Sequence, residues 1–290
     1  ILKAFKICRK YRMNAIYVLD GIYYELSGLA VAKISGIPLV VRLRTNEVKL
    51  RSILRYNFIK RFLGNFVTML TVKHAKQVVC ISHELRDLVL GWGVNPSKVR
   101  IVYHGVDSNH FKPMKVEKPF SKVVLFIGGF APGKGASAVI EVAKSLENVH
   151  FLMLGPKTTK SEISRLPRNV HFLGIASRDR MPLYYNMCDL LVLPSSTEGL
   201  PDVILEAFAC GKPVIASRVG EIQWIVSSKF GWVIEPNDVK GLKDTIQNAL
   251  SDEKLLIAMG RAARGYVIKN FQWVSYVKEM TSVLKASYDE

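Results

Sequence analysis

The sequence predicts an α/β protein made of two doubly wound units with parallel sheets. Short runs rich in Val, Ile and Leu alternate with amphipathic helical segments along all 290 residues. These runs are continuously apolar, as are strands buried on both faces, whereas half-exposed strands alternate apolar and polar residues. With 49% hydrophobic residues, the chain is long enough for two cores of ordinary size.

The expected strands fall into two groups. They lie at residues 14–19, 37–43, 77–82 and 98–103 in the first half, and at 122–128, 150–155, 169–174, 189–194, 212–217 and 231–236 in the second. Residues 104–120 contain Gly, two Pro and mixed charge, which is typical of a linker. We therefore expect one domain over residues 1–112 and a second over residues 113–273, with ligands at the carboxyl ends of the strands.

Charge is unevenly distributed between the halves. The net charge is +17, but residues 1–120 carry 21 Lys and Arg against 7 Asp and Glu, whereas residues 121–290 carry 20 against 17. A basic first half indicates an anionic partner: a membrane surface, a phosphorylated acceptor or a nucleic acid. A proteome generally rich in Lys and Arg is the alternative, and the asymmetry within one chain weakens it.

Residues 48–76 interleave basic and apolar side chains. The basic residues of interest are Lys49, Arg51, Arg55, Lys60 and Arg61. A basic amphipathic helix can lie in a membrane interface, so residues 49–61 are the segment expected to meet an anionic membrane surface. A long core helix with a solvated charged face is an equal alternative, because the apolar stripe must face something in either case.

Other features exclude several classes of protein. No run reaches the roughly 18 uncharged apolar residues of a spanning helix. The basic start, ILKAFKICRKYR, lacks an apolar core and a cleavage site, so it is not expected to be a signal peptide. The cysteines at positions 8, 80, 188 and 210 form no Cys-x-x-Cys pair, which indicates a reducing cytoplasm and argues against disulfides or a zinc site.

The stretch PSSTEGLPDVILEAFACGKPVIAS, residues 194–217, places two carboxylates around one helix start. Glu198 follows an apolar strand, and Glu206 lies on a helix that Pro201 is expected to begin and Gly211 to end. A helix N-terminus suits a phosphate, and a carboxylate can accept hydrogen bonds from two neighbouring hydroxyls. A nucleotide-sugar combines a diphosphate with vicinal diols at both ends, so the pattern indicates such a ligand.

This stretch resembles the E-x7-E signature of retaining, nucleotide-sugar-dependent glycosyltransferases of family four (glycosyl transferases group 1). Further segments follow in the family's order: VCIS, KVRIVYHGVD, FIGGFAPGKG, NVHFLG, CDLLVLPSSTEG, GWVIEPND and FQW. The resemblance covers nearly the whole chain. It implies the GT-B fold, with two Rossmann-like doubly wound domains, and a C-terminal helix, residues 274–290, that packs back on the first domain.

The resemblance also implies roles for individual residues. Glu206 would hold the ribose hydroxyls, Glu198 would orient the donor sugar, and Lys134 would neutralise the leaving diphosphate. Glu198 and Lys134 are therefore the catalytic candidates. The other donor-binding candidates lie around the phosphates and the base, and they are Gly128, Gly129, Ile175, Gly199, Leu200 and Pro201.

The implied reaction moves a sugar from a nucleoside diphosphate, expected to be UDP, to an acceptor hydroxyl with retention of the anomeric configuration. Neither a metal nor another cofactor is implied, since Lys134 and the helix end can neutralise the diphosphate. The basic first domain fits a polysaccharide or lipid-linked acceptor of cell-envelope glycan or glycolipid synthesis. We expect a cytoplasmic protein that is peripheral to the inner face of the cell membrane.

The sequence departs from the family pattern in the second half. Gly129 stands where family members usually have Arg, and Arg178 or Arg180 is the candidate substitute. The segment VGEIQWI, residues 219–225, replaces a G-G-x-P-E motif.

The first half departs further. The usual opening strand and Gly-rich loop have no counterpart, so the first domain is expected to be incomplete. Arg44 stands where a histidine is usual, and His104 stands where Asn is frequent. Both are acceptor-side candidates, although a structural role at the domain junction is favoured for His104.

Three other functions stay open on the sequence. The first is a non-catalytic binding module of the same fold, which Gly129 and the missing opening segment would explain. The second is a nucleic-acid-binding protein, against which the aromatic residues are not interleaved with the basic ones in any known module. The third is a sugar-nucleotide epimerase, which shares the architecture but not this E-x7-E context.

Overall fold

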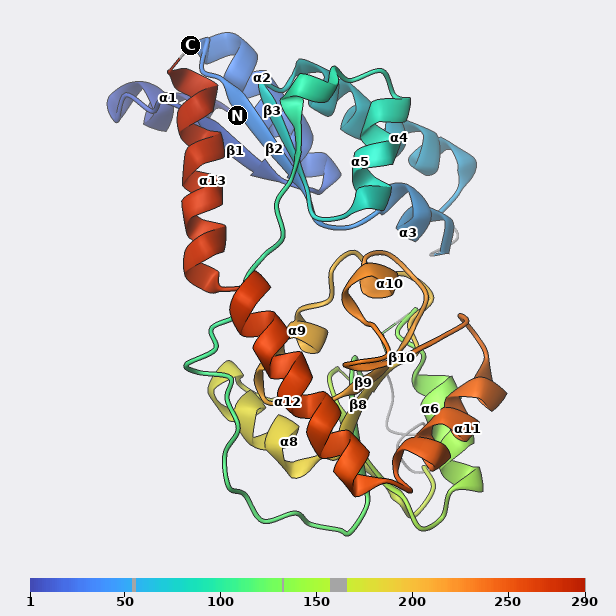
Figure 1. Ribbon diagram of the computed structural model, residues 1–290. Helices are drawn as coiled ribbons and strands as arrows, with labels where there is room; N and C mark the ends of the chain where they lie inside the picture. The colour runs from blue at the N-terminus through green and yellow to red at the C-terminus, as the bar shows by residue number, and fades with distance from the viewer. Residues whose placement is uncertain (54–55, 132, 157–165, 290) are drawn as a thin grey trace. The chain divides into compact units, whose positions relative to one another are not determined.

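The structure is a computed structural model that describes residues 1–53, 56–131, 133–156 and 166–289 (Figure 1). It divides into two compact units, Ile1–His104 with Val274–Glu290, and Gly105–Trp273. The sequence placed the boundary at 112/113. Residues 105–111 instead contact the second unit, since Val106 pairs with Gln272 and the Phe111 carbonyl accepts a hydrogen bond from Arg264.

The first unit contains a parallel sheet of four strands in the order β1-β2-β3-β4. The strands are β1 (Ile16–Leu19), β2 (Leu39–Leu43), β3 (Gln77–Cys80) and β4 (Val99–Ile101). The helices are α1 (Leu2–Lys10), α2 (Ile22–Ser35), α3 (Glu47–Ile53), α4 (Phe58–His74), α5 (His83–Gly91), the 3-10 helix η1 (Pro96–Lys98) and α13 (Trp273–Tyr288). The four strands expected in the first half are therefore confirmed.

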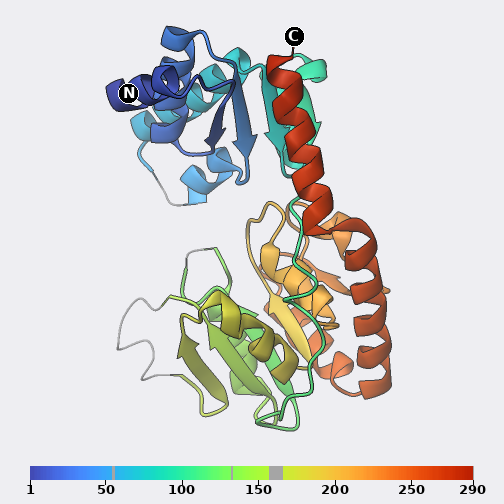
Figure 2. The ribbon, with the colours of Figure 1, turned by 90° about the vertical axis from the view of Figure 1, so that its left-hand side faces the viewer.

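Helices cover both faces of this sheet. Successive side chains of a strand point to opposite faces. On one face α2 packs on β1 and β2, and α4 packs on α2 and β2. On the other, Met280 and Val283 of α13 close over Val40 and Val79, and Figure 2 shows this helix running along the strands.

One expected helix is two helices in the structure. The basic segment from residue 48 to 76 forms α3 and α4, and the side chain of Asn57 caps α4 by accepting a hydrogen bond from the Lys60 backbone N–H. Asn is a favoured N-cap because its oxygen satisfies a donor that the first helical turn leaves open. Arg55 lies outside the described residues.

The second unit contains a parallel sheet of six strands in the order β10-β9-β8-β5-β6-β7. The strands are β5 (Val123–Ile127), β6 (His150–Leu154), β7 (Val170–Gly174), β8 (Leu190–Leu193), β9 (Val214–Ser217) and β10 (Gly231–Ile234). The helices are α6 (Ala136–Ser145), η2 (Arg178–Arg180), α8 (Met181–Met187), α9 (Asp202–Ala209), α10 (Ile222–Ile225), α11 (Val239–Ala249) and α12 (Glu253–Asn270). All six strands expected in the second half are confirmed.

The strand order creates one switch point. From β5 the chain winds outward through β6 and β7, and then returns to β8, on the other side of β5, and winds through β9 and β10. Helices α6 and α11 pack together over one face, whereas α8, α9 and α12 pack over the other (Figures 1 and 2). In doubly wound sheets, ligands bind where the winding direction reverses, at the carboxyl ends of the strands. Here that place lies between β5 and β8.

Candidate functional site

An ion pair lies at the switch point. Lys134 is in the loop after β5 and Glu198 is in the loop after β8. The Lys134 Nζ is 2.7 Å from the Glu198 Oε1, and the side chains are 36% and 8% exposed. The sequence predicted that both would act on one ligand, and the structure places them in direct contact.

Close packing of the two loops brings this pair together. The Ser196 backbone N–H donates to the Gly133 carbonyl at 2.8 Å. Gly135 has φ +85°, and a Cβ there would lie 2.2 Å from the Pro194 carbonyl oxygen. Only glycine permits both this backbone conformation and this approach. The loop after β5 therefore lies against the loop after β8.

Gly128 and Gly129 lie on the other side of the Lys134 loop. A Cβ at Gly128 would be 2.9 Å from the Lys134 Cβ, so the absent side chain leaves room for the lysine stem. The N–H groups of Gly128 and Gly129 both donate to the Leu154 carbonyl, at 2.9 and 2.8 Å. These donors hold the loop to β6, so Gly128 and Gly129 support Lys134 through the backbone.

The helix that follows Glu198 begins as expected. Pro201 is the N-cap of α9, and Gly211, with φ +72°, follows its end. Among the described residues, the N–H groups of Gly199 and Leu200 donate no hydrogen bond. With the N-terminus of α9, they form a patch of backbone N–H donors that follows Glu198 in the chain, at the positive end of the helix dipole, where the carboxylate of Asp202 also lies.

The segment at 219–225 braces this patch. The buried Glu221 donates its backbone N–H to the Gly199 carbonyl at 2.9 Å. The segment VGEIQWI, which departs from the family pattern, therefore still contacts the loop that contains Glu198 and Gly199.

Glu206 is held by a residue that the sequence did not identify. The Tyr185 hydroxyl on α8 donates to the Glu206 Oε2 at 2.7 Å. Burial raises the pKa of the Glu206 carboxyl to about 7, an effect that the hydrogen bond from Tyr185 opposes. The two residues are 21 positions apart, and the only sequence signal was a tyrosine on the helix that precedes β8.

The remaining second-unit candidates surround this side of the sheet. Ile175, just after β7, is 79% exposed. The guanidinium of Arg178 lies 5.6 Å from the ring centre of Phe111, and that of Arg180 lies 5.9 Å from the ring centre of Tyr184. Arg178 also lowers the pKa of Glu206, so its charge acts at the Glu206 end of the site.

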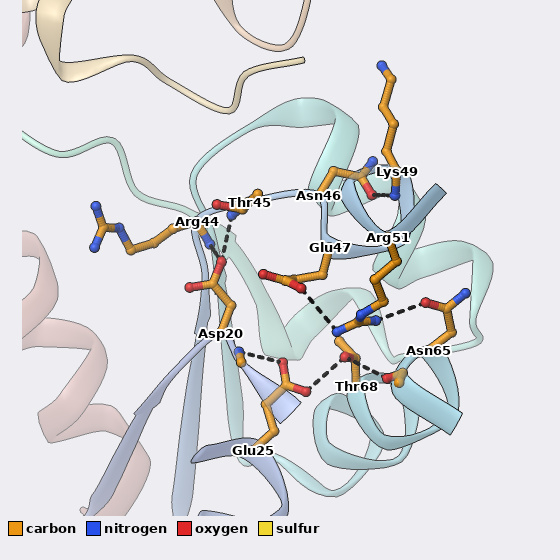
Figure 3. Close-up of polar contacts among 12 residues, drawn as sticks. Asp20, Glu25, Arg44, Thr45, Asn46, Glu47, Lys49, Arg51, Asn65 and Thr68 are labelled. Atoms are coloured by element: carbon orange, nitrogen blue, oxygen red, sulfur yellow. Dashed lines mark hydrogen bonds and ion pairs between the residues drawn. The ribbon is translucent and has the colours of Figure 1, made fainter. Parts of the chain in front are cut away.

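The acceptor-side candidates lie in the first unit. The exposed side chain of Arg44 points away from the other labelled groups in Figure 3. The Asp20 Oδ2 accepts from the N–H groups of Arg44 and Thr45, at 2.9 and 2.6 Å, which fixes the loop after β2. His104 is buried, with 8% exposure, at the end of the unit.

A buried polar network lies beside this loop (Figure 3). Arg51 donates to Asn65 at 2.8 Å and forms an ion pair with Glu47 at 3.2 Å. Glu25, which is fully buried, accepts from the Thr68 hydroxyl at 2.8 Å, and burial raises its pKa. The expectation that Arg51 faces a membrane is wrong, because the side chain is only 2% exposed and is held by these partners.

Two absences hold for residues 1–53, 56–131, 133–156 and 166–289. No helix there is long and apolar enough to cross a membrane. No group of three or more His, Cys, Asp or Glu side chains there is placed to hold a metal ion.

Two Rossmann-like units in one chain, with charged side chains at the switch point of the second, are the arrangement of the GT-B fold. Comparison with family models identifies the family. Residues 107–266 match the glycosyl transferases group 1, and residues 1–110 match glycosyltransferase family 4. The chain belongs to this glycosyltransferase family, as the resemblance implied.

Solved structures share this fold. The sucrose-phosphate synthase of Thermosynechococcus elongatus superposes with a TM-score of 0.87 at 22% identity, covering 98% of this chain and 76% of that chain. Anabaena HepE, solved in complex with UDP-glucose, gives a TM-score of 0.83 at 20% identity, covering 98% and 81%. At these identities the likeness establishes the GT-B fold.

Curated relatives are glycosyltransferases. An uncharacterized glycosyltransferase of Methanocaldococcus jannaschii is 26% identical over 232 residues, 78% of this chain and 64% of that protein. The UDP-Gal:alpha-D-GlcNAc-diphosphoundecaprenol alpha-1,3-galactosyltransferase of Escherichia coli is 25% identical over 313 residues, 97% of this chain and 77% of that protein. The chain spans 53 to 64% of the length of three of the curated relatives it matches.

Proposed function

We propose that this protein is a retaining glycosyltransferase that moves a sugar from a nucleoside diphosphate, UDP, to an acceptor hydroxyl. The observation that carries the proposal is the Lys134–Glu198 pair, which lies at the switch point beside the start of α9. HepE was solved with UDP-glucose, and the Escherichia coli relative is named for UDP-Gal, which supports UDP as the nucleotide.

Each charged group has one task in the proposed reaction. The bond between the anomeric carbon and a diphosphate oxygen breaks, a bond from the acceptor oxygen to that carbon forms on the same face, and the acceptor's proton passes to the departing diphosphate oxygen. Lys134 and the N–H groups at the start of α9 neutralise the diphosphate as it leaves. Glu198 accepts hydrogen bonds from the sugar hydroxyls, and Glu206 accepts those of the ribose.

We propose that no metal or other cofactor takes part, because Lys134 and the helix end already supply positive charge to the diphosphate. The remaining donor contacts are assigned to the backbone of Gly199 and Leu200, the loop held by Gly128 and Gly129, and the exposed Ile175 for the base. Turnover that persists after EDTA treatment is the expected result.

The proposed acceptor is a lipid-linked or polysaccharide hydroxyl, reached from the cytoplasmic side of a membrane. Two relatives, from Escherichia coli and Campylobacter jejuni, are named for diphosphoundecaprenol-linked acceptors. The first half of this chain carries the larger excess of positive charge. Arg44, at the carboxyl edge of the first unit's sheet, is the proposed acceptor-side contact, whereas His104 is buried and is assigned a structural role.

The membrane contact is assigned to the outer surface of α4. Five apolar side chains form what we call the aromatic face of α4, and they are Phe58, Ile59, Phe62, Leu63 and Phe66. Their exposed fractions run from 46% to 73%, and the three rings stack in sequence at 6.3 and 6.4 Å. Lys60 and Arg61 flank them, which suits the interface of an anionic bilayer.

Replacing Phe58 and Phe62 by serine is expected to weaken binding to anionic vesicles by about tenfold or more, because burying each ring in lipid contributes roughly 1.5 to 3 kcal/mol. Co-sedimentation with anionic and with neutral vesicles measures this. The matched control replaces Leu255 and Ile257 of α12, which are 44% and 49% exposed. Equal binding of the unaltered protein to both vesicle types would contradict an anionic partner.

The test of the function combines binding with turnover. Among UDP, GDP, ADP and their sugars, UDP compounds are expected to raise the melting temperature by about 5 °C or more at saturation. UDP-sugar turnover is expected in the unaltered protein and is expected to fall about 10²-fold in Glu198→Gln. The control is Glu235→Gln, which removes a carboxylate that pairs with Arg218 at 2.7 Å and is 65% exposed.

The other outcomes separate the alternatives. Nucleotide binding without turnover, unchanged in Glu198→Gln, identifies a non-catalytic module of the same fold, which the glycine at position 129 would explain. No nucleotide effect, together with steeply salt-dependent binding of DNA or RNA, identifies a nucleic-acid-binding protein.

A further inference from the structure

Tyr185 is placed to control Glu206. Its side chain is fully buried on α8, and its hydroxyl donates to the Glu206 Oε2 at 2.7 Å. The Phe111 ring packs edge-on against it, with the ring centres 5.9 Å apart. A buried phenol needs a partner for its O–H, and rigid packing fixes the direction of that O–H. The tyrosine therefore fixes the position of one carboxylate oxygen.

The second carboxylate oxygen is left for a ligand. Within the described ranges, the Oε1 of Glu206 makes no hydrogen bond, and the side chain keeps partial exposure. A carboxylate that is held at one oxygen presents the other in a single direction. Such a group is pre-organised to accept a hydroxyl without losing further rotamer freedom.

We propose that Tyr185 is the positioning residue of the nucleotide end of the site, which holds Glu206 so that its free oxygen accepts the ribose hydroxyls. This inference rests on the proposed function, because that function assigns the ribose to Glu206. Tyr185 acts through Glu206 and does not touch the reacting atoms.

The positioning role of Tyr185 can be measured through the pH dependence of nucleotide binding, because this dependence follows the ionisation of Glu206. The groups that face its carboxyl come from α8, α9, η2 and the linker, and they are Tyr185, Asp202, Cys210, Arg178 and His110. The pKa of Glu206 is raised to about 7, chiefly by burial and also by Asp202, against the lowering effects of Tyr185, Arg178 and His110. The ionised carboxylate is the better acceptor, so nucleotide affinity rises as the pH rises through about 7.

The sign of the effect of Tyr185 follows from its hydrogen bond. The O–H donates to the charged form of Glu206 and so stabilises it. Removing the hydroxyl raises the pKa of Glu206 further, and the rise in affinity then occurs at a higher pH. A residue with a purely structural role would lower stability without moving this midpoint.

The test measures UDP-glucose binding by calorimetry across a pH series that spans the Glu206 pKa of about 7. UDP-glucose is used because its esterified diphosphate does not titrate in this range, whereas the terminal phosphate of UDP does. Tyr185→Phe keeps the packed ring and is expected to weaken UDP-glucose binding about tenfold at neutral pH and to shift the midpoint upward by about one pH unit. Tyr184→Phe, the neighbouring position on α8, is expected to behave like the unaltered protein. Glu206→Gln is expected to weaken binding and to abolish the pH dependence.

The outcomes distinguish this inference from the function on which it rests. If the unaltered protein binds no nucleoside diphosphate, the proposed function fails. If it binds and Glu206→Gln weakens binding, but Tyr185→Phe has the affinity and midpoint of the unaltered protein, only the role of Tyr185 is overturned. If Tyr185→Phe does not fold, the unaltered protein and Glu206→Gln decide the matter. A nucleotide affinity of the unaltered protein that does not change with pH overturns the inference. An affinity that rises as the pH passes through about 7, and that loses this rise in Glu206→Gln, supports it.

Discussion

Replacing Lys134 by alanine is expected to lower kcat by about 10²-fold to about 10³-fold, with a smaller change in KM. The ammonium lies 2.7 Å from the Glu198 Oε1, in the loop after β5. In the proposed reaction, negative charge accumulates on the diphosphate oxygen as its bond to the anomeric carbon breaks. The lysine is therefore expected to stabilise the transition state more than the bound substrate. Steady-state kinetics with a UDP-sugar measures the change.

The chain offers a matched control for this substitution. Lys118 pairs with Asp189 at 2.6 Å with 35% side-chain exposure, compared with 2.7 Å and 36% for Lys134. Asp189 precedes β8 and accepts from the Val123 N–H, so this second pair lies at the amino ends of the strands. Lys118→Ala is expected to leave kcat unchanged. Equal losses in the two variants would mean that Lys134 acts through stability rather than through the diphosphate.

Replacing Gly129 by alanine is expected to destabilise the second unit by about 3 kcal/mol or more, which is about 6 °C or more in melting temperature. Gly129 has φ +53°, and a Cβ there would lie 2.2 Å from the Pro156 carbonyl oxygen and 2.7 Å from the Gly155 carbonyl carbon. The neighbouring atoms are backbone and cannot rotate away. The loop must therefore leave its hydrogen bonds to Leu154 to admit a side chain.

Gly174→Ala separates the two sources of this cost. Gly174 has φ +72°, but nothing lies within 4 Å of the position of its Cβ. Gly174→Ala is therefore expected to lower the free energy of unfolding by only the cost of placing alanine in a left-handed backbone conformation, about 1 to 2 kcal/mol. Thermal unfolding followed by circular dichroism compares the two variants. Equal shifts in melting temperature would show that the crowding at Pro156 does not contribute.

The crowding at the Cβ position of Gly129 also affects how the usual family arginine could be placed there. An arginine at position 129 would start from the same blocked Cβ, so Gly129→Arg is not a simple restoration of the usual second cation. The loop after β5 has a path that only glycine permits at this position. The positive charge near the site is then that of Lys134 and of the start of α9, with Arg178 acting on Glu206.

The sequence predicted the strands of both units and, in the second unit, the start and end of the helix that follows Glu198. Strands buried on both faces are continuous apolar runs, and this pattern located all ten strands to within a few residues. The E-x7-E stretch predicted the end of β8, the cap at Pro201 and the turn at Gly211, because these depend on local chemistry. The direct contact between Lys134 and Glu198 follows from the strand order, which places β5 beside β8.

Long-range partners could not be predicted in this way. Tyr185 reaches Glu206 only because α8 and α9 pack on the same face of the sheet. Arg51 has one local partner, Glu47, at the i, i+4 spacing that a sequence can show, but the partner that holds it from α4 is Asn65. The amphipathic pattern of residues 48–76 therefore predicted an exposed Arg51, whereas the side chain is buried.

The cover that α13 provides has a consequence for synthesis. Met280 and Val283 close over Val40 and Val79, yet these valines leave the ribosome more than two hundred residues earlier. The second unit is one continuous stretch of chain and can fold before translation reaches α13. Until then the face of the first unit's sheet that contains Val40 and Val79 remains exposed to solvent. During that interval a holdase chaperone could bind this apolar face.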